Sequence, residues 1–224
     1  MRGQLPLKGL RVLDLASFIA APVATTVMGD YGAEVIKIEP PGEGDPQRKL
    51  GQAHSIPQHP VNFCWHLTNR NKRAIVLDLK SDGGRAAFDR LARTADVMVV
   101  NFPLKVRERL RMRYADVAAL NPRLIYASMT GYGEQGPDAD QPGFDSTAFF
   151  ARSGLLDALS YAEGPPAFSL PAQGDQMAGM NLFAAITMAL LHRERTGQGS
   201  EVTTSLHAGG LWSNAMLAQG ALLG

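Results

Sequence analysis

The sequence predicts an α/β fold, in which a Rossmann-like parallel sheet carries helices on both faces. Short runs rich in valine, isoleucine and leucine alternate with segments of helical spacing, and this alternation is typical of parallel sheets wrapped by helices. The runs expected to be strands cover residues 11–15, 34–38, 74–78, 96–100, 124–127 and 200–204. Because ligands bind beyond the carboxyl ends of the strands in such sheets, we expect a site at that edge.

The expected helices lie between these strands. Residues 21–31 have helical spacing, with Pro22 suited to the first turn and Gly32 directly after the last residue. Further helices are expected over about residues 82–94, over the long apolar segment 176–194, over 207–217, and over a short basic stretch with Lys105, Arg107 and Arg109.

Two segments do not follow this pattern. Residues 40–60 are rich in proline, glycine, glutamine and histidine, which predicts a long loop that is either functional or mobile. Residues 131–143, GYGEQGPDADQPG, are expected to form an acidic connector.

Composition limits the classes of function. The chain has 224 residues, of which 45% are apolar, so it can bury a substantial core. Lysine and arginine total 22 against 21 for aspartate and glutamate, and this near-neutral balance argues against nucleic acid as a main partner. Cys64 is the only cysteine, which excludes an intrachain disulfide and a multi-cysteine zinc site.

No sequence pattern indicates export or membrane insertion. The first residues lack the continuous apolar stretch of a signal peptide. The longest apolar run near the carboxyl end, residues 182–191, is shorter than the roughly 20 residues that span a bilayer. We therefore expect a soluble, cytoplasmic protein with no membrane partner.

Common nucleotide and metal motifs are not supported. The GxxxxGK[ST] pattern is absent, and the GxGxxG pattern at residues 131–136 is followed at once by Pro137 with no helical pattern behind it. The five histidines show neither HxxxH spacing nor a nearby carboxylate pair. Neither a metal nor a resident cofactor is expected.

Asp175, which directly precedes the long apolar helix, has two interpretations. Aspartate is among the best N-cap residues because it accepts hydrogen bonds from first-turn amides, and capping is its commoner role. A carboxylate at a helix N-terminus is also held ionised by the helix dipole, and a nucleophilic carboxylate needs that state. Gly174 beside it is expected to let a substrate approach the backbone closely. The two interpretations are compatible.

Short motifs follow one another in a fixed order over nearly the whole chain. They are LRVLDL (10–15) leading to Ala21-Pro22, GAEVIKIE (32–39) with PPGEGD (40–45), NKR (71–73) before LDLK (77–80), ADV (95–97) before Asn101-Phe102, LNPRLI (120–125), GYG (131–133), PGFD (142–145), Gly174-Asp175 and TGQG (196–199). In this order they resemble class III coenzyme A transferases, the CaiB/BaiF family of formyl-, carnitine- and phenyllactate-type enzymes.

The resemblance implies that residues 1–220 form the family's large domain, with 221–224 beginning a linker. It implies that the family's small domain and its carboxyl-terminal return to the large domain are absent from the chain, and that the full-length protein is a homodimer. The expected substrates are an acyl-CoA and a carboxylic acid, so coenzyme A is a substrate here and not a cofactor.

Site residues follow from the same resemblance. Asp175 matches the nucleophile that passes through an aspartyl mixed anhydride and an aspartyl-CoA thioester. The residues that match coenzyme A contacts are Phe18, Ile19, Ala20, Leu77, Leu79, Lys80, Asn101, Phe102 and Arg109. Lys80 and Arg109 suit phosphate groups, and Phe102 offers a flat face to adenine. Without the resemblance, the basic helix would be read as a solvated face, and Phe18 and Leu77 as ordinary core.

Departures from the family pattern bear on the reaction. Ile19 stands where some members carry glutamine, which favours a larger, drier acyl pocket and makes an oxalate-like substrate less expected. Phe144 stands where related acyl-CoA racemases carry a histidine base, and phenylalanine cannot remove a proton. Phe144, Phe149 and Phe150 either line an acyl pocket or pack a helix. The alternatives to a transferase are an acyl-CoA racemase or isomerase, and a truncated domain that only binds coenzyme A or dimerises.

Overall fold

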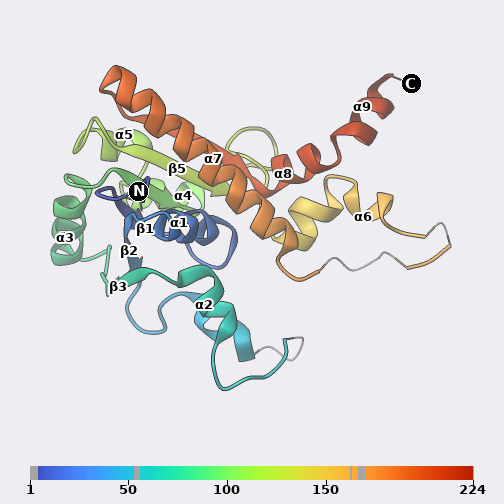
Figure 1. Ribbon diagram of the computed structural model, residues 1–224, viewed down its shortest axis with the longest axis horizontal. Coiled ribbons are helices and arrows are strands. Elements are labelled where there is room, and N and C mark those ends of the chain that lie inside the picture. The colour runs from blue at the N-terminus through green and yellow to red at the C-terminus, as the bar shows by residue number, and fades with distance from the viewer. Residues whose placement is uncertain (1–4, 53–55, 162, 166–169, 224) are drawn as a thin grey trace.

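The computed structural model describes residues 5–52, 56–161, 163–165 and 170–223 of the chain. Its centre is a six-stranded sheet with the strand order β3-β2-β1-β4-β5-β6 (Figure 1). All neighbouring strands are parallel, which confirms the predicted fold class. The strands are β1 (Arg11–Asp14), β2 (Glu34–Glu39), β3 (Lys72–Val76), β4 (Val97–Val100), β5 (Ile125–Thr130) and β6 (Ser200–Ser205).

Helices connect the strands and continue beyond β6. They are α1 (Ala20–Asp30), α2 (Phe63–Asn69), α3 (Asp82–Ala92), α4 (Leu104–Arg109), α5 (Tyr114–Ala118), α6 (Leu155–Ala158), α7 (Gln173–Thr196), α8 (Leu206–Ser213) and α9 (Ala215–Leu223), with a 3-10 helix η1 (Pro46–Gln52) and a π-helical segment η2 (Asp145–Ala151). In the described part of the chain, no helix has the length and apolar character needed to cross a membrane.

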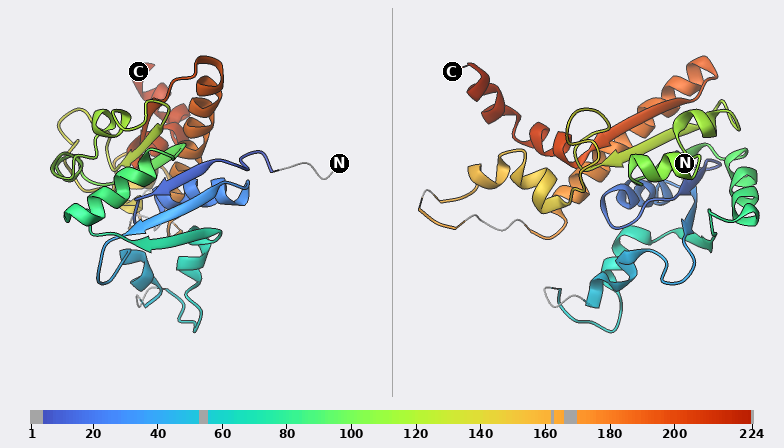
Figure 2. Two further views of the ribbon diagram at one scale, coloured as in Figure 1. Left: turned by 90° about the vertical axis from the view of Figure 1, so that its left-hand side faces the viewer. Right: turned by 180° about the vertical axis from the view of Figure 1, so that it is seen from behind.

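Helices lie on both faces of the sheet (Figure 2), and each face has its own apolar core. On one face, α1 and α7 pack against alternate strand residues such as Val12 and Ile125. On the other face, Phe88 of α3 and Val117 of α5 pack with Leu13. Successive side chains of a strand point to opposite faces, so a strand buried on both sides is apolar throughout. This explains why β4, with the sequence VMVV, is fully buried.

Several predicted boundaries differ from the observed ones, and three of the differences have a clear structural form. β3 begins at Lys72 and not at position 74, because it pairs with β2 from Lys72 opposite Val35. The helix expected over 207–217 is two helices separated at Asn214, whose side-chain amide donates to Ser153 O at 3.0 Å. The helix expected from 176 begins at Gln173. The domain limit at 220 stays a prediction, and α9 continues across that position.

A group of buried charges lies where β1, β2 and β3 meet. Asp14, Lys37, Asp45 and Lys72 have side chains no more than 2% exposed. Lys72 Nζ contacts Asp14 Oδ2 at 2.8 Å, and Lys37 Nζ contacts Asp45 Oδ2 at 2.8 Å. We call these four residues the buried ion group.

Burial and pairing act against each other in this group. Burial favours a raised pKa for Asp14, but the charges of Lys37 and Lys72 outweigh it and hold the pKa below its ordinary value. Burial lowers the pKa of Lys72 to about 8, although Asp14 opposes this shift. Such pairs persist in the interior only when their remaining polar atoms are bonded. Lys72 Nζ accordingly also donates to Pro22 O and Thr68 O.

The segment expected to be a long loop is held in place by this group. Asp45 Oδ1 accepts hydrogen bonds from the backbone N–H groups of Phe18 and Gln47 at 3.1 and 2.9 Å. Gln47 Nε2 donates to Thr68 Oγ1 at 2.8 Å. The first half of the segment is therefore attached to the sheet through Asp45 and continues as η1, which packs against α2. Residues 53–55 lie outside the described residues.

Replacing Lys72 by methionine tests how much the folded state depends on intact pairing within the buried ion group. We expect Lys72→Met to lower the free energy of unfolding by about 3–5 kcal/mol, because Asp14 then stays buried without its nearest cation. Arg73→Met on the same strand is the control: its side chain is 72% exposed and pairs with Glu34, so the expected loss is below about 1 kcal/mol. Urea unfolding at pH 7 measures both, and equal losses would contradict the assignment.

Candidate active site

A pocket of about 750 Å³ opens at the carboxyl ends of β1, β4 and β5, the edge predicted from the fold class. We call it the Asp175 pocket. Most of its lining comes from the loop after β1, the segment after β4, the connector after β5 and the start of α7, and Leu50 of η1 and Leu206 of α8 complete it. Of the predicted site residues, it is lined by Phe18, Ile19, Ala20, Asn101, Phe102 and Asp175.

The loop between β1 and α1 is held by hydrogen bonds from two sides. Ser17 N donates to Asn101 Oδ1 at 3.0 Å, and Asn101 Nδ2 donates back to Ser17 O at 2.8 Å. Phe18 N donates to Asp45 Oδ1, and Phe18 has a φ of 63°. A phenylalanine in the left-handed region is strained, and the surrounding bonds maintain that conformation. The loop therefore presents Phe18 and Ile19 to the pocket in one fixed arrangement.

Asp175 is not an N-cap residue, so the capping interpretation is wrong. It is the third residue of α7, and the N-cap position is occupied by Ala172, whose φ is 61°. No side chain at that position caps the helix. Instead, Asp145 of η2 accepts a hydrogen bond from Gly174 N at 3.2 Å, so a residue from a distant segment bonds the helix start. The Asp175 side chain remains half-buried against the pocket.

Gly174 serves packing within the protein rather than approach of a substrate. A Cβ at this position would overlap Asp145 Oδ1 and the ring of Phe149. Gly174 itself is buried. The expectation that this glycine opens the backbone to a ligand is therefore wrong; its small size lets η2 lie directly against α7.

The environment of Asp175 does not simply keep its carboxyl ionised, as the helix-dipole argument predicted. Burial, and after it the negative charge of Asp145, raises the pKa of Asp175 to about 7. Burial also raises the pKa of Asp145, while the N–H groups of Gly174 and Ala172 oppose this. Two carboxyl groups in one partly buried site disfavour each other's ionised form. A shift of this kind is frequent at functional sites.

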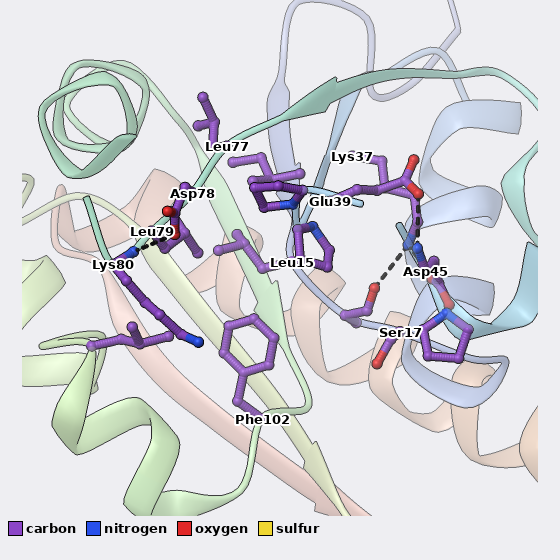
Figure 3. A pocket seen from close by; sticks show the side chains of 16 residues that line it. Leu15, Ser17, Lys37, Glu39, Asp45, Leu77, Asp78, Leu79, Lys80 and Phe102 are labelled. Atoms are coloured by element: carbon purple, nitrogen blue, oxygen red, sulfur yellow. Dashed lines mark hydrogen bonds and ion pairs between the residues drawn. The ribbon is translucent and has the colours of Figure 1, made fainter. Parts of the chain in front are cut away.

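A second pocket, of about 460 Å³, adjoins the first and shares Ser17 and Phe102 with it. Figure 3 shows Leu15, Leu79 and Phe102 around this pocket, with Lys80 on one side and Asp45 on the opposite side. The predicted residues that line it are Leu77, Leu79, Lys80 and Phe102.

A third pocket, of about 420 Å³, shares Leu79, Lys80 and Leu110 with the second. It contains the predicted Arg109 together with two cations that the sequence argument missed, Arg85 and Arg111. Arg85 comes from α3, and its position on a helix preceding α4 gave no reason to group it with Arg109. The available signal was the motif LDLK, which ends just before α3 and contains the predicted Lys80.

All the predicted site residues therefore line three adjoining pockets along one edge of the sheet. The basic helix is not a uniformly solvated face. Arg107 is buried and its Nη1 contacts Glu134 Oε1 at 2.5 Å, whereas Arg109 is exposed at the third pocket.

The three phenylalanines near η2 divide between the two expected roles. Phe144 is 59% exposed and lines the Asp175 pocket, where its ring lies edge-on to Phe18 with centroids 6.1 Å apart. Phe149 and Phe150 are buried in the core beneath α7. The GxGxxG segment forms turns after β5, and no helix follows it directly. Within the described residues, no cluster of metal-ligand type is present.

Comparison with known proteins shows the family to which the chain belongs. The model of CoA-transferase family III matches residues 7–223. The chain belongs to this family. It is similar to the cinnamoyl-CoA:phenyllactate CoA-transferase of Clostridium sporogenes, with 41% identity over 214 residues, which cover 95% of this chain and 52% of that protein. The acetyl-CoA:oxalate CoA-transferase of Acetobacter aceti is also 41% identical, over 92% of this chain and 52% of that protein.

A solved structure supports the same family. The crystal structure of a CaiB/BaiF family protein from Brucella suis matches with a TM-score of 0.90 and 32% identity, over 99% of this chain and 58% of that chain. The resemblance stated from the sequence is thus confirmed. The chain spans about half the length of the curated relatives it matches.

The raised pKa of Asp175 predicts a pH dependence of stability. The folded chain holds this proton more tightly than the unfolded chain, so the carboxyl contributes stability below pH 3.8 that is lost as pH rises to about 7. We expect Asp175→Asn, which cannot ionise, to unfold at higher urea concentration than the unsubstituted chain at pH 8.

That advantage of Asp175→Asn should shrink towards pH 4, where the native carboxyl is protonated. Asp157→Asn on α6 removes an exposed carboxylate and is the control for loss of a charge. A constant difference between Asp175→Asn and the unsubstituted chain from pH 4 to 8 would refute the assigned shift.

Proposed function

We propose that the protein carrying this chain is an acyl-CoA:carboxylate CoA-transferase, with Asp175 as its nucleophile. The observation that carries this proposal is the row of three adjoining pockets, which contains cations at one end and Asp175, a carboxyl with a raised pKa, at the other. Coenzyme A has the matching polarity, since its phosphates lie far from its thioester. The relatives named above are CoA-transferases.

Each pocket suits one part of coenzyme A. Lys80 and Arg109, with Arg85 and Arg111, would bind phosphate groups, because arginine and lysine donors match phosphate oxygens. Leu77, Leu79 and the ring of Phe102 supply apolar walls for the adenine and pantetheine parts. The thioester would then lie beside Phe18, Ile19, Ala20 and Asn101, facing Asp175.

The proposed reaction begins with attack of an Asp175 oxygen on the thioester carbonyl carbon. The carbon–sulfur bond breaks, coenzyme A leaves as a thiolate, and an aspartyl mixed anhydride remains. The thiolate attacks the aspartyl carbonyl, which releases the first acid and forms an aspartyl-CoA thioester. The incoming carboxylate attacks that thioester, a second anhydride forms, and the thiolate takes the new acyl group. Asp175 is regenerated, and no proton is consumed.

The surroundings of Asp175 suit both the attack and the protection of the anhydride. A pKa of about 7 leaves a substantial fraction of the carboxyl ionised at neutral pH and makes that carboxylate more basic than one in water. Partial burial beneath the connector and η2 limits access of water, which would hydrolyse the anhydride.

Racemase or isomerase activity is less well supported. Proton removal next to the thioester carbonyl needs a base on that side of the acyl group. Phe144 stands at the position where related racemases carry a histidine base, and phenylalanine cannot remove a proton. No histidine lines the described part of the Asp175 pocket. Incubation with a chiral 2-methylacyl-CoA in deuterated water distinguishes the two reactions, since a transferase incorporates no deuterium at the α-carbon.

We also propose that the full-length protein is a homodimer. Exposed apolar side chains at the carboxyl end of the chain support a contact surface there. Those with the highest exposure are Trp212, Met216, Leu222 and Leu223. Figure 1 shows α8 and α9 leading away from the sheet.

Asp175→Ala tests the nucleophile. We expect the variant to lose transfer of coenzyme A by at least about 10³-fold, because the covalent path is removed. Mass spectrometry after incubation with acyl-CoA should show an adduct on the Asp175 peptide of the unsubstituted protein only. Full exchange in the variant would end the assignment. A folded protein that binds coenzyme A but never forms the adduct would favour the binding-only alternative.

Arg109→Ala tests the cationic end. If Arg109 contacts the 3′-phosphate, the variant should bind coenzyme A about 10-fold more weakly, and 3′-dephospho-coenzyme A nearly as well as before. Arg90→Ala on α3 removes an exposed arginine outside the third pocket and is the matched control. Calorimetric titration measures the dissociation constants. If the variant loses the same affinity for both ligands, Arg109 does not contact the 3′-phosphate.

A further inference from the structure

The Asp175 pocket contains carboxyl groups and no cation among the described residues that line it. Its ionisable members are Asp140, Asp145 and Asp175. Lys105, which is outside the lining and has an 81% exposed side chain, contacts Asp140 at 2.7 Å. Asp140 therefore has a paired cation, whereas Asp145 and Asp175 have no ion-pair partner among the described residues. A substrate with a second carboxylate near these two would meet like charge, which disfavours its binding.

Most of the remaining lining of this pocket is apolar, and two of its aromatic rings are incompletely covered. Phe144 is 59% and Phe18 is 40% exposed, whereas Phe149 and Phe150, which follow shortly after, are buried. The rings of Phe18 and Phe144 meet at 90°, the edge-to-face arrangement in which a further ring or branched chain packs well. Leu50 and Ile19 extend the apolar wall.

The backbone around these rings is held in place. The strained conformation of Phe18 is maintained by Asp45, and Phe144 N donates to Thr147 Oγ1 at 2.9 Å at the start of η2. A Cβ at Gly131 would lie 2.7 Å from Gly143 Cα, so the connector that carries Phe144 crosses the end of β5 in close contact. Phe18 and Phe144, which we call the aromatic wall, are therefore held in place by the surrounding backbone.

We infer, on the basis of the transferase function proposed above, that the acids exchanged in this pocket are monocarboxylic acids with an uncharged aryl or branched aliphatic side chain. Short dicarboxylic acids are rejected by the carboxyl groups around Asp175. Overall identity does not decide this point, because the chain is 41% identical both to a relative named for phenyllactate and to one named for oxalate. The charge and shape of the pocket carry the inference.

A competition among acceptor acids tests this substrate class. With acetyl-CoA as the common donor, the full-length protein is offered 3-phenylpropionate, 4-methylpentanoate, butyrate, oxalate and succinate, and each new acyl-CoA is measured by mass spectrometry. We expect kcat/KM for the first two acids to exceed that for succinate and oxalate by at least about 30-fold, since a buried unpaired charge is excluded strongly. Comparable or faster conversion of a dicarboxylate would overturn the inference while leaving the transferase function in place. Conversion of no acid at all would overturn both.

Two variants locate the selectivity. Phe144→Ala should lower the ratio of kcat/KM for 3-phenylpropionate to that for butyrate by about 10-fold, because apolar contact is lost only for the larger acid. Phe144→Arg should raise the ratio for succinate to 3-phenylpropionate by supplying the missing cation. Phe63→Ala, at a phenylalanine that is 42% exposed on α2 and lies outside the pocket, is the control and should change neither ratio. Unchanged ratios in both Phe144 variants would refute the assignment of the aromatic wall.

Discussion

The buried ion group positions the candidate site. Lys72 binds Asp14 at the end of β1, and Lys37 binds Asp45 in the segment after β2. Charged side chains from separate strands and the following segment are therefore buried together. Ion pairs of this kind contribute little net stability relative to apolar packing, but removing one member leaves a costly unpaired charge. Their effect is to define position. Through Asp45, the group maintains the strained Phe18 loop, and this loop forms one wall of the Asp175 pocket.

Along this edge of the sheet, the charge of the pocket lining changes from the third pocket to the first. The third pocket holds cations, the second is mainly apolar, and the first contains the partly buried carboxyl groups of Asp145 and Asp175. Asp145 has two effects on Asp175: it bonds the start of α7 through Gly174 N, and its charge contributes to the raised pKa. The same feature that orients the proposed nucleophile therefore also sets its proton affinity and opposes a second anionic group.

The sequence predicted the sheet because each strand contains a run of apolar or β-branched residues, and this pattern persists whatever the strand contacts. β3, which begins with two basic residues, was placed too late in the chain. It failed for α2, α5 and α6, which are short and receive their stability from packing rather than from their own periodicity. Asp175 was assigned to the correct pocket edge but to the wrong position in its helix. Asp145, which accepts a hydrogen bond from Gly174 N at the start of this helix, lies far earlier in the chain, and no local pattern reveals such a contact.

By itself, the sequence determined the parallel α/β fold, the edge of the sheet that carries the site, and the residues that resemble those of CoA-transferase family III. Hydrophobic periodicity and motif order are local properties of the chain, so they can be read without coordinates. Only the tertiary structure decided that Asp175 is the third residue of α7 with a pKa near 7, that Gly174 is small because Phe149 and Asp145 lie against it, and that no described cation enters the pocket. Burial and charge proximity decide these properties, and both depend on segments that meet only when the chain folds.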